Sequence, residues 1–275
     1  MIPEIRTPFE ALSCIQNTRL RGHCNFLDAS ILLRPLLFDM FISGENMQYQ
    51  TIPQSQSTTL SLEQNKVLRN TYLMLALTMI PTIIGAFAGM ATDFSFMAKH
   101  PIAAPLLMFG AMMGMLFGVT ALRNSVWGIV ALLGFTFVAG WFLGPILQHA
   151  LHLKNGGQLV GMAAGGTGLI FFGLATVATV TKKDFSFMGK FLFIGLILLI
   201  VASLANIFFA IPALSLTISA IAVMIFSAYI LFDISQIVHG GETNYVMATM
   251  TLYLDIYNIF ISLLNLLMAF GGERD

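Results

Sequence analysis

Seven apolar runs, each long enough to cross a membrane as a helix, dominate the chain from residue 71 onward. They cover approximately 71–91, 103–122, 126–148, 158–180, 190–210, 213–237 and 246–270. A spanning helix needs about 20 residues. The chain is 57% hydrophobic and only 9% charged, against about 25% charged residues in soluble domains. The sequence therefore predicts an all-α polytopic membrane protein with seven transmembrane helices. The lipid bilayer is its expected surrounding, and nucleic acid is not expected as a partner, because no basic patch carries interleaved aromatics.

Residues 1–46 do not share the pattern of the rest of the chain. Acidic residues come early and no uninterrupted apolar stretch follows a basic start, so the segment lacks the layout of a signal peptide. A polar leader then begins at its own methionine, Met47. We interpret residues 1–46, which hold both cysteines, Cys14 and Cys24, as a non-native or disordered extension. The remaining parts are a polar cytoplasmic leader (47–70), a transmembrane domain (71–270) and a short tail (271–275).

The distribution of lysine and arginine between the joints predicts the orientation in the membrane. With the N-terminus inside, six cations lie in inner segments: Lys66, Arg69, Arg123, Lys182, Lys183 and Lys190. Three lie in outer segments: Lys99, Lys154 and Arg274. Because cytoplasmic loops carry an excess of Lys and Arg, this count favours a cytoplasmic N-terminus and an external C-terminus.

Glycines recur at a spacing of four in several spans, and small residues at that spacing let helix backbones approach closely in lipid. Three spans carry the pairs Gly85 and Gly89, Gly140 and Gly144, and Gly161 and Gly165. One span carries three in series, Gly110, Gly114 and Gly118, and this series is the strongest candidate for a contact seam. The alternative is that membrane helices are simply rich in glycine.

A seven-residue segment occurs twice, as "DFSFMAK" at 93–99 and as "DFSFMGK" at 184–190. The copies follow the first and the fourth spans and would lie on opposite sides of the membrane, as an inverted repeat demands. Chance recurrence of common interfacial residues is the alternative. A true repeat would make spans one to three and four to six two related layers, with span seven at the centre.

Two carboxylates interrupt the last two apolar runs. Asp233 lies near the end of span 213–237, in "AYILFDISQIV", and Asp255 lies inside span 246–270. A charged group at the centre of a membrane costs about 2.5–3.5 kcal/mol on insertion scales and is functional by default. The short joint "HGGETNY" makes the two spans antiparallel, so the two carboxylates can meet. A water-facing helix end is the alternative for Asp233.

Polar residues in the last span recur at intervals of four, three, four and three residues, which places them on one helical face. They are Thr251, Asp255, Asn258, Ser262 and Asn265. We call these five residues the polar stripe. A polar face on a membrane helix meets a cavity or other helices, so the stripe either lines a hydrated path or makes hydrogen bonds between helices.

Enzyme chemistry is not favoured by the motifs present. An intramembrane aspartyl protease also carries two aspartates on adjacent helices, but it has GxGD at the second acid. Here the residues before Asp255 are Leu252, Tyr253 and Leu254, without a glycine. His149 and His152 are close, but no third metal ligand stands near them. No enzyme activity and no bound cofactor are therefore expected.

Several segments together resemble the Bax inhibitor-1 family of membrane proteins. They are "ILFDISQIVHGGETNY", "TLYLDIYNIFISLL", "KKDFSFMGKFL" and "FVAGWFLGPIL", and "KVLRNTYLMLAL" is most similar to the YccA-like bacterial branch. The resemblance covers about residues 60–272 and implies two three-helix layers around a central last helix in a bacterial inner membrane. It also implies that Asp233 and Asp255 match paired aspartates that sense pH in calcium-leaking members. Arg123 falls near the position of an arginine that latches the sixth-helix aspartate in such members.

Two functions are therefore expected as alternatives. In the first, the aspartate pair shares one proton, because two carboxylates in a poorly hydrated site cannot both ionise cheaply. Loss of that proton would open a leak and leave a transient contact for calcium, a cation that prefers oxygen ligands. In the second, the resemblance implies a non-conducting modulator of the membrane AAA protease FtsH or of membrane-protein quality control.

Overall fold

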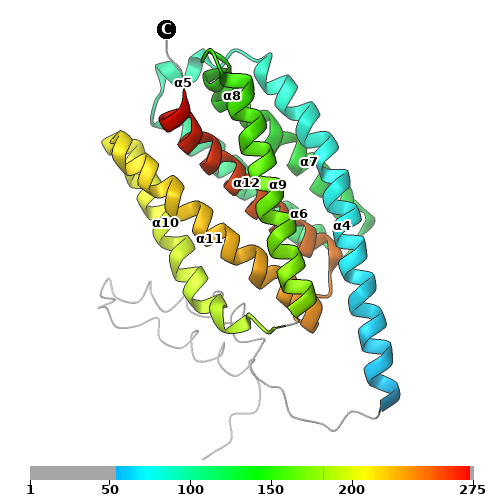
Figure 1. Cartoon of the computed structure of the whole chain (residues 1–275). Helices are drawn as coiled ribbons and strands as arrows, with labels where there is room; N and C mark the ends of the chain where they lie inside the picture. Colours follow the sequence, from blue (N-terminus) through cyan, green and yellow to red (C-terminus); the bar gives the residue numbers. More distant parts are fainter. Residues whose placement is uncertain (1–53, 182, 273–275) are drawn as a thin grey trace, which may run out of the picture. The chain divides into compact units, whose positions relative to one another are not determined.

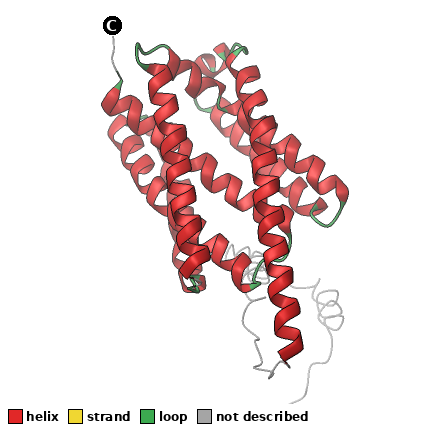
Figure 2. Ribbon diagram, turned by 45° about the vertical axis from the view of Figure 1, so that its right-hand side comes forward, coloured by secondary structure: helices red, strands yellow, loops and turns green. Residues whose placement is uncertain are grey.

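The computed structural model describes residues 54–181 and 183–272, and within them the chain is built of helices and short loops. Figures 1 and 2 show an all-helical bundle without strands in the described part. Seven of its helical segments are long and apolar enough to span a membrane. The predicted number of spans and the all-α class are thus confirmed. The hypotheses on residues 1–46, on Met47 as a start, and on the end of the tail lie outside the described residues.

The helices follow one another with short connections. In chain order they are α4 (Gln54–Met90), α5 (Ser95–Lys99), α6 (Ala103–Leu122), α7 (Val126–Phe142), α8 (Gly144–Leu151), α9 (Gly156–Thr181), the 3-10 turn η1 (Ser186–Met188), α10 (Gly189–Phe209), α11 (Pro212–His239) and α12 (Tyr245–Gly271). The first helix begins well before its apolar run, so the described part of the polar leader continues it as one helix.

The last helix, α12, lies at the centre of the bundle (Figure 1). It packs against α4, α7, α8, α9 and α11, whereas α6 packs mainly on α7 and α10 mainly on α11. Leu252, Tyr253, Ile259 and Leu264 of α12 have at most 1% of their surface exposed. A central last helix is what the family resemblance implied, and the structure confirms it.

Glycines bring α4 and α7 into close contact at two of the predicted glycine pairs, but not at the series predicted to be the strongest seam. A Cβ added to Gly85 or Gly89 would overlap the backbone of Phe137 or Trp141, and one added to Gly140 would overlap Thr82. The predicted seam of Gly110, Gly114 and Gly118 was wrong, because those positions face open space. The spacing was the same in both cases. The difference is that α6 turns this face away from its neighbour.

The third span is broken into two helices, which the apolar run did not predict. Between α7 and α8 the chain turns at Leu143 and Gly144, with Pro145 in the first turn of α8. The side chain of Gln148 on α8 donates to the carbonyl oxygens of Gly89, Met90 and Thr92, at 2.9–3.2 Å. Carbonyl groups at a helix end lack the partners of the helix interior, and Gln148 supplies a donor to these three at and just beyond the end of α4, of which Gly89 O also accepts from Thr92 N–H.

The two copies of the repeated segment adopt the same local structure. In each, the aspartate Oδ1 accepts a 2.8 Å hydrogen bond from the backbone N–H two residues on: Ser95 for Asp93, and Ser186 for Asp184. A short helical turn follows both, α5 in one case and η1 in the other. The copies lie at opposite ends of the bundle, as Figure 1 shows. This placement agrees with an inverted repeat.

Candidate functional site

A tight turn between α11 and α12 sets the two aspartates against each other. Gly240 has φ +78°, in the left-handed region that favours glycine, and the N–H of Gly241 donates to Gln236 O at 2.8 Å. Asn244 then caps α12, because its side-chain oxygen accepts from the N–H groups of Val246 and Met247. The chain therefore reverses within a few residues, and α11 and α12 run antiparallel in close contact.

The carboxyl groups of Asp233 on α11 and Asp255 on α12 lie close enough to act on each other. We call these two residues the aspartate pair. Asp255 is only 4% exposed, and its Oδ2 is buried without a hydrogen bond in the described structure. Asp233 is half-buried. The structure thus brings together the two residues that the sequence singled out, and their role as a pH sensor stays a prediction.

Three further groups surround the aspartate pair. Thr251, one turn before Asp255, lies beside the Asp233 carboxyl group, and its hydroxyl donates to Ala248 O at 3.2 Å in its own helix. Glu242 in the turn and Tyr229 on α11 are close enough to interact with the pair through their charges. Among the residues that the structure describes, no lysine or arginine acts on either carboxylate. A second negative charge on the pair would therefore be opposed by Glu242 and not offset by a nearby lysine or arginine.

The rest of the polar stripe lines a cavity of about 450 Å³, whose wall is mostly apolar but carries seven polar side chains; we call it the polar cavity. Asn258, Ser262 and Asn265 face it from α12, one to three turns beyond Asp255. Four polar residues complete its wall from α10 and α11: Ser203, Asn206, Ser215 and Ser219. The side-chain amide of Asn258 donates to Leu254 O in its own helix. The stripe therefore divides into two parts, with Thr251 and Asp255 at the pair and the other three at the cavity.

Apolar packing closes the bundle on the other side of the pair. Between the pair and the α11–α12 turn lie Ile234, Ile237, Val246 and Met250, each at most 3% exposed. The aspartate pair therefore lies between the α12 residues that line the polar cavity and a buried, mostly apolar region next to the α11–α12 turn.

Arg123 lies near the α11–α12 turn but is not joined to the aspartate pair. It forms the C-cap of α6, its side chain is exposed, and its backbone oxygen accepts a 3.1 Å hydrogen bond from Asn244. Among the described residues no ion pair links it to Asp233. Its role as a latch stays a prediction.

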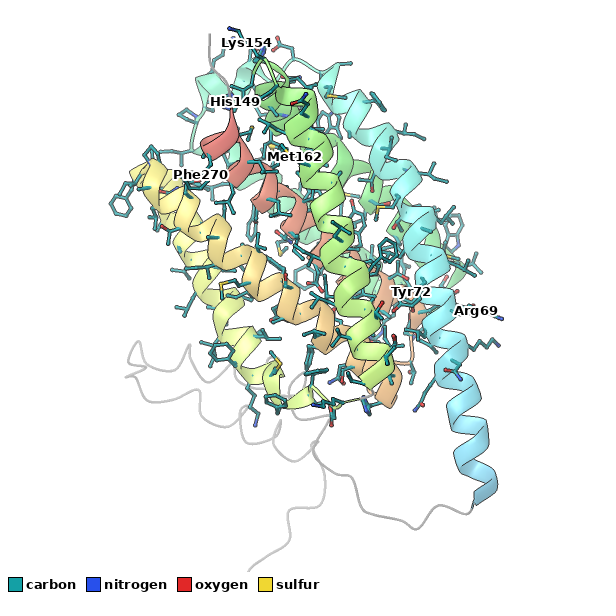
Figure 3. All side chains as sticks on the ribbon, viewed as in Figure 1. Arg69, Tyr72, His149, Lys154, Met162 and Phe270 are labelled. Atoms are coloured by element: carbon teal, nitrogen blue, oxygen red, sulfur yellow. The ribbon has the colours of Figure 1, made fainter. Side chains whose placement is uncertain are left out.

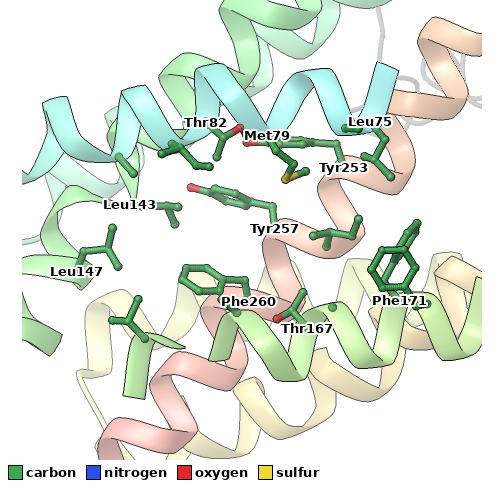
Figure 4. Close-up of a pocket in the computed structure, with 18 of the residues that line it drawn as sticks. Leu75, Met79, Thr82, Leu143, Leu147, Thr167, Phe171, Tyr253, Tyr257 and Phe260 are labelled. Carbon is green, nitrogen blue, oxygen red and sulfur yellow. Dashed lines mark hydrogen bonds between the residues drawn. The ribbon is translucent and has the colours of Figure 1, made fainter. Parts of the chain in front are cut away.

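Two tyrosines of α12 hydrogen-bond the central helix to α4 and α7, and we did not predict this role from the sequence. Tyr253 OH lies 3.0 Å from the Thr82 hydroxyl of α4, and Tyr257 OH donates to Ala139 O of α7 at 3.0 Å. The two hydroxyl groups are visible in Figure 4. The signal was present as two tyrosines four residues apart in an apolar run, on one helical face.

The described residues do not form a metal site with three or more protein ligands. No group of three or more His, Cys, Asp or Glu side chains lies together in the described residues. The two carboxylates of the pair offer oxygen ligands, and a transient calcium contact there stays a prediction.

The fold and the site define a seven-helix membrane protein with a central last helix that carries half of a buried aspartate pair. A family model described as "Inhibitor of apoptosis-promoting Bax1" matches residues 64–272. The chain therefore belongs to the Bax inhibitor-1 family.

Three relatives are similar over most of the chain. An uncharacterized membrane protein of Vibrio cholerae is 44% identical over 75% of this chain and 91% of its own length. The Escherichia coli protein named "Modulator of FtsH protease YccA" is 41% identical over 78% of this chain and 95% of its own length. The same identity and coverage hold for a protein of a second Escherichia coli strain named "Inner membrane protein YccA". These descriptions name an inhibitor and a modulator, not a catalysed reaction.

Proposed function

We propose that the protein is a slow cation leak of the bacterial inner membrane, controlled by a proton that Asp233 and Asp255 share. The supporting observation is the position of the aspartate pair between the polar cavity and the packed apolar half of the bundle. Calcium is the proposed permeant ion, because the oxygen atoms along this route suit a hard divalent cation.

The pair would work through charge. With one proton between them, the two carboxyl groups hydrogen-bond to each other and hold α11 against α12. Two unit charges about 4 Å apart repel by about 4 kcal/mol at an effective dielectric constant of 20, so loss of the proton would loosen this contact. Glu242 would add to the repulsion. The leak should therefore rise with pH.

The proposed orientation places the N-terminus in the cytoplasm and the C-terminus outside, from the count of six inner against three outer cations. In that orientation the polar cavity lies in the outer half of the bundle and the packed region in the inner half. A rise in cytoplasmic pH would then remove the shared proton of the pair at the inner end of the path.

A flux assay in liposomes tests the proposal, with calcium and proton dyes and stepwise changes of pH. The wild-type protein should leak more calcium as the pH rises, and Asp255→Asn should remove this dependence, because it keeps the shape and abolishes the charge. Asp184→Asn, at an exposed carboxylate outside the spans, is the matched control and should behave as wild type. Equal pH dependence in Asp233→Asn, Asp255→Asn and the double variant would sink the proposal.

The candidate latch is tested in the same assay. Because Arg123 is exposed and not paired with Asp233 in the structure, Arg123→Gln should leave the leak unchanged at every pH. A leak that exceeds the wild-type leak at high pH, and equals it at low pH, would support the latch that the family resemblance implies.

A second candidate function is modulation of an FtsH-type protease, and it is supported by the name of the 41% identical Escherichia coli relative. Purified protein and FtsH reconstituted together should then degrade a membrane substrate at a different rate from FtsH alone. If the double aspartate-to-asparagine variant modulates FtsH normally but no longer leaks in a pH-dependent way, the two activities are separate. No effect of wild-type protein on FtsH would remove this candidate.

A further inference from the structure

A large apolar groove lies on the opposite side of α12 from the polar cavity. It has a volume of about 1030 Å³, and its walls come from α4 and α9, with α12 as the floor and α8 at one end. Figure 4 shows Met79 and Thr82 of α4 facing Thr167 and Phe171 of α9, with Tyr257 and Phe260 of α12 between them. The two wall helices pack closely on α12 but not on each other. We call this space the α4–α9 groove.

The groove offers almost nothing to a polar ligand. The hydroxyl groups of its threonines are engaged with the protein: Thr82 with Thr78 O, Thr167 with Ala163 O, Thr176 with Phe172 O, and Thr179 with Ala175 O. Two of its three tyrosines, Tyr253 and Tyr257, are bonded to α4 and α7, and the third, Tyr72, lies at one end of the groove. The remaining lining is Leu, Ile, Val, Ala, Met, Phe and one glycine. A cavity of this kind stays dry and takes apolar ligands, so its occupant is a hydrocarbon.

The groove also matches the thickness of a membrane. Its lining on α4 extends from Tyr72 to Met90, which is about 27 Å at 1.5 Å per residue, against about 30 Å for the hydrocarbon core of a bilayer. Exposed apolar side chains flank it, among them Phe87 at 66% and Phe172 at 69% exposure. The groove is therefore surrounded by acyl chains along its whole length.

Cations stand at one end of the groove. Arg69 precedes Phe87 by eighteen residues, or five whole helical turns, so it lies on the same line of α4 and continues the lip of the groove. Figure 3 shows Arg69 exposed one turn below Tyr72 at this end. On the other wall, Lys183 is exposed four residues after Thr179. Arg69 and Lys183 thus stand at the same end of the two groove walls, where the head group of a lipid with an acyl chain in the groove would lie.

We infer that the α4–α9 groove binds an acyl chain of an anionic phospholipid, whose phosphate lies between Arg69 and Lys183. The leaflet is the one at the N-terminal end of α4. This inference does not depend on the aspartate pair, because the groove shares no lining residue with the polar cavity.

Native mass spectrometry of the full chain, released from nanodiscs of phosphatidylglycerol and phosphatidylethanolamine in equal parts, tests the inference. One retained phospholipid is expected, with phosphatidylglycerol preferred about thirtyfold, since each of the two cations near the surface contributes on the order of 1 kcal/mol. Gly168→Leu should fill the groove and reduce the retained lipid. Gly173→Leu, also on α9 but exposed and outside the groove lining, is the matched control and should retain it.

The head-group part has its own variants. Arg69→Gln with Lys183→Gln should abolish the preference for phosphatidylglycerol while lipid is still retained, whereas Lys99→Gln with Lys190→Gln should keep the preference. Equal retention in Gly168→Leu and wild type would overturn the groove as the site. Equal retention of both lipids by wild type would overturn the phosphate contact. A photoreactive residue at Phe87 that crosslinks in cells to protein, including a second copy of this chain, and not to lipid would also overturn the inference.

Discussion

At the scale of single residues, glycine position matters more than glycine spacing. Gly85 lies against the backbone of α7, and Gly114 on α6 has open space around it. Both belong to series with a spacing of four. The sequence could show that such series exist, but not which one faces a partner, because helix rotation is set by packing that involves distant parts of the chain.

Alanine substitutions separate the two series. Gly85→Ala should destabilise the protein by about 1–3 kcal/mol, because the new methyl group would overlap the carbonyl oxygen of Phe137 and force α4 and α7 apart. Gly114→Ala should be neutral or slightly stabilising, because alanine has the better helix propensity. Thermal unfolding in detergent measures both. Equal losses in the two variants would contradict the α4–α7 seam.

Asp184 gives a pH dependence outside the membrane spans. Hydrogen bonds from Ser186, and to a smaller extent the nearby His239, lower the pKa of this carboxyl below its usual 3.8. Because the folded state holds the ionised form, the stabilisation is present above about pH 4 and is lost as the pH falls through the lowered pKa. Asp184→Asn should therefore lower the unfolding temperature slightly at pH 7 and not at pH 3. The opposite order would show that the charge is unfavourable there.

At the scale of elements, α12 shows what periodicity can and cannot predict. The spacing of the polar stripe predicted that Asn258, Ser262 and Asn265 share one face, and all three line the same cavity. It could not show that Thr251 and Asp255 serve a different contact. That division depends on where α11 crosses α12, which the Gly240 turn fixes. The break at Gly144 was missed for a related reason, because hydropathy does not register a turn between two apolar helices.

Cysteine labelling along α12 tests the division. Asn258→Cys and Asn265→Cys should react with a small water-soluble thiol reagent added from the side of the C-terminus, because both line the polar cavity. Ile259→Cys and Leu264→Cys should stay protected, because both native side chains are fully buried. The measurement is made in a variant without Cys14 and Cys24. Labelling at all four positions would mean that α12 is not packed as described.

At the scale of the whole molecule, the sequence predicted the spans well because hydrophobic length follows directly from bilayer thickness. Six of the seven predicted runs correspond to one helix each, and the third corresponds to α7 with α8. The α4–α9 groove could not be predicted, because its lining is ordinary apolar sequence and the space arises only from how α4 and α9 flank α12.

Reporter fusions test the orientation of the bundle. A periplasmic reporter fused after Asp275 or after Lys154 should be active, because seven spans with a cytoplasmic N-terminus place both positions outside. A fusion after Arg123 should be inactive. An active reporter only at Arg123 would reverse the orientation and place the polar cavity in the inner half of the bundle.

The central claim is that Asp233 and Asp255 hold one proton between them, and infrared spectroscopy of the protein in lipid tests it most directly. We expect a carbonyl stretch of a buried protonated carboxyl group at neutral pH. This band should disappear as the pH rises, over the same pH range in which the calcium leak begins. The band should shift in Asp233→Asn and be absent in the double asparagine variant. A wild-type spectrum without this band at neutral pH, or a band that persists in the double variant, would contradict the account.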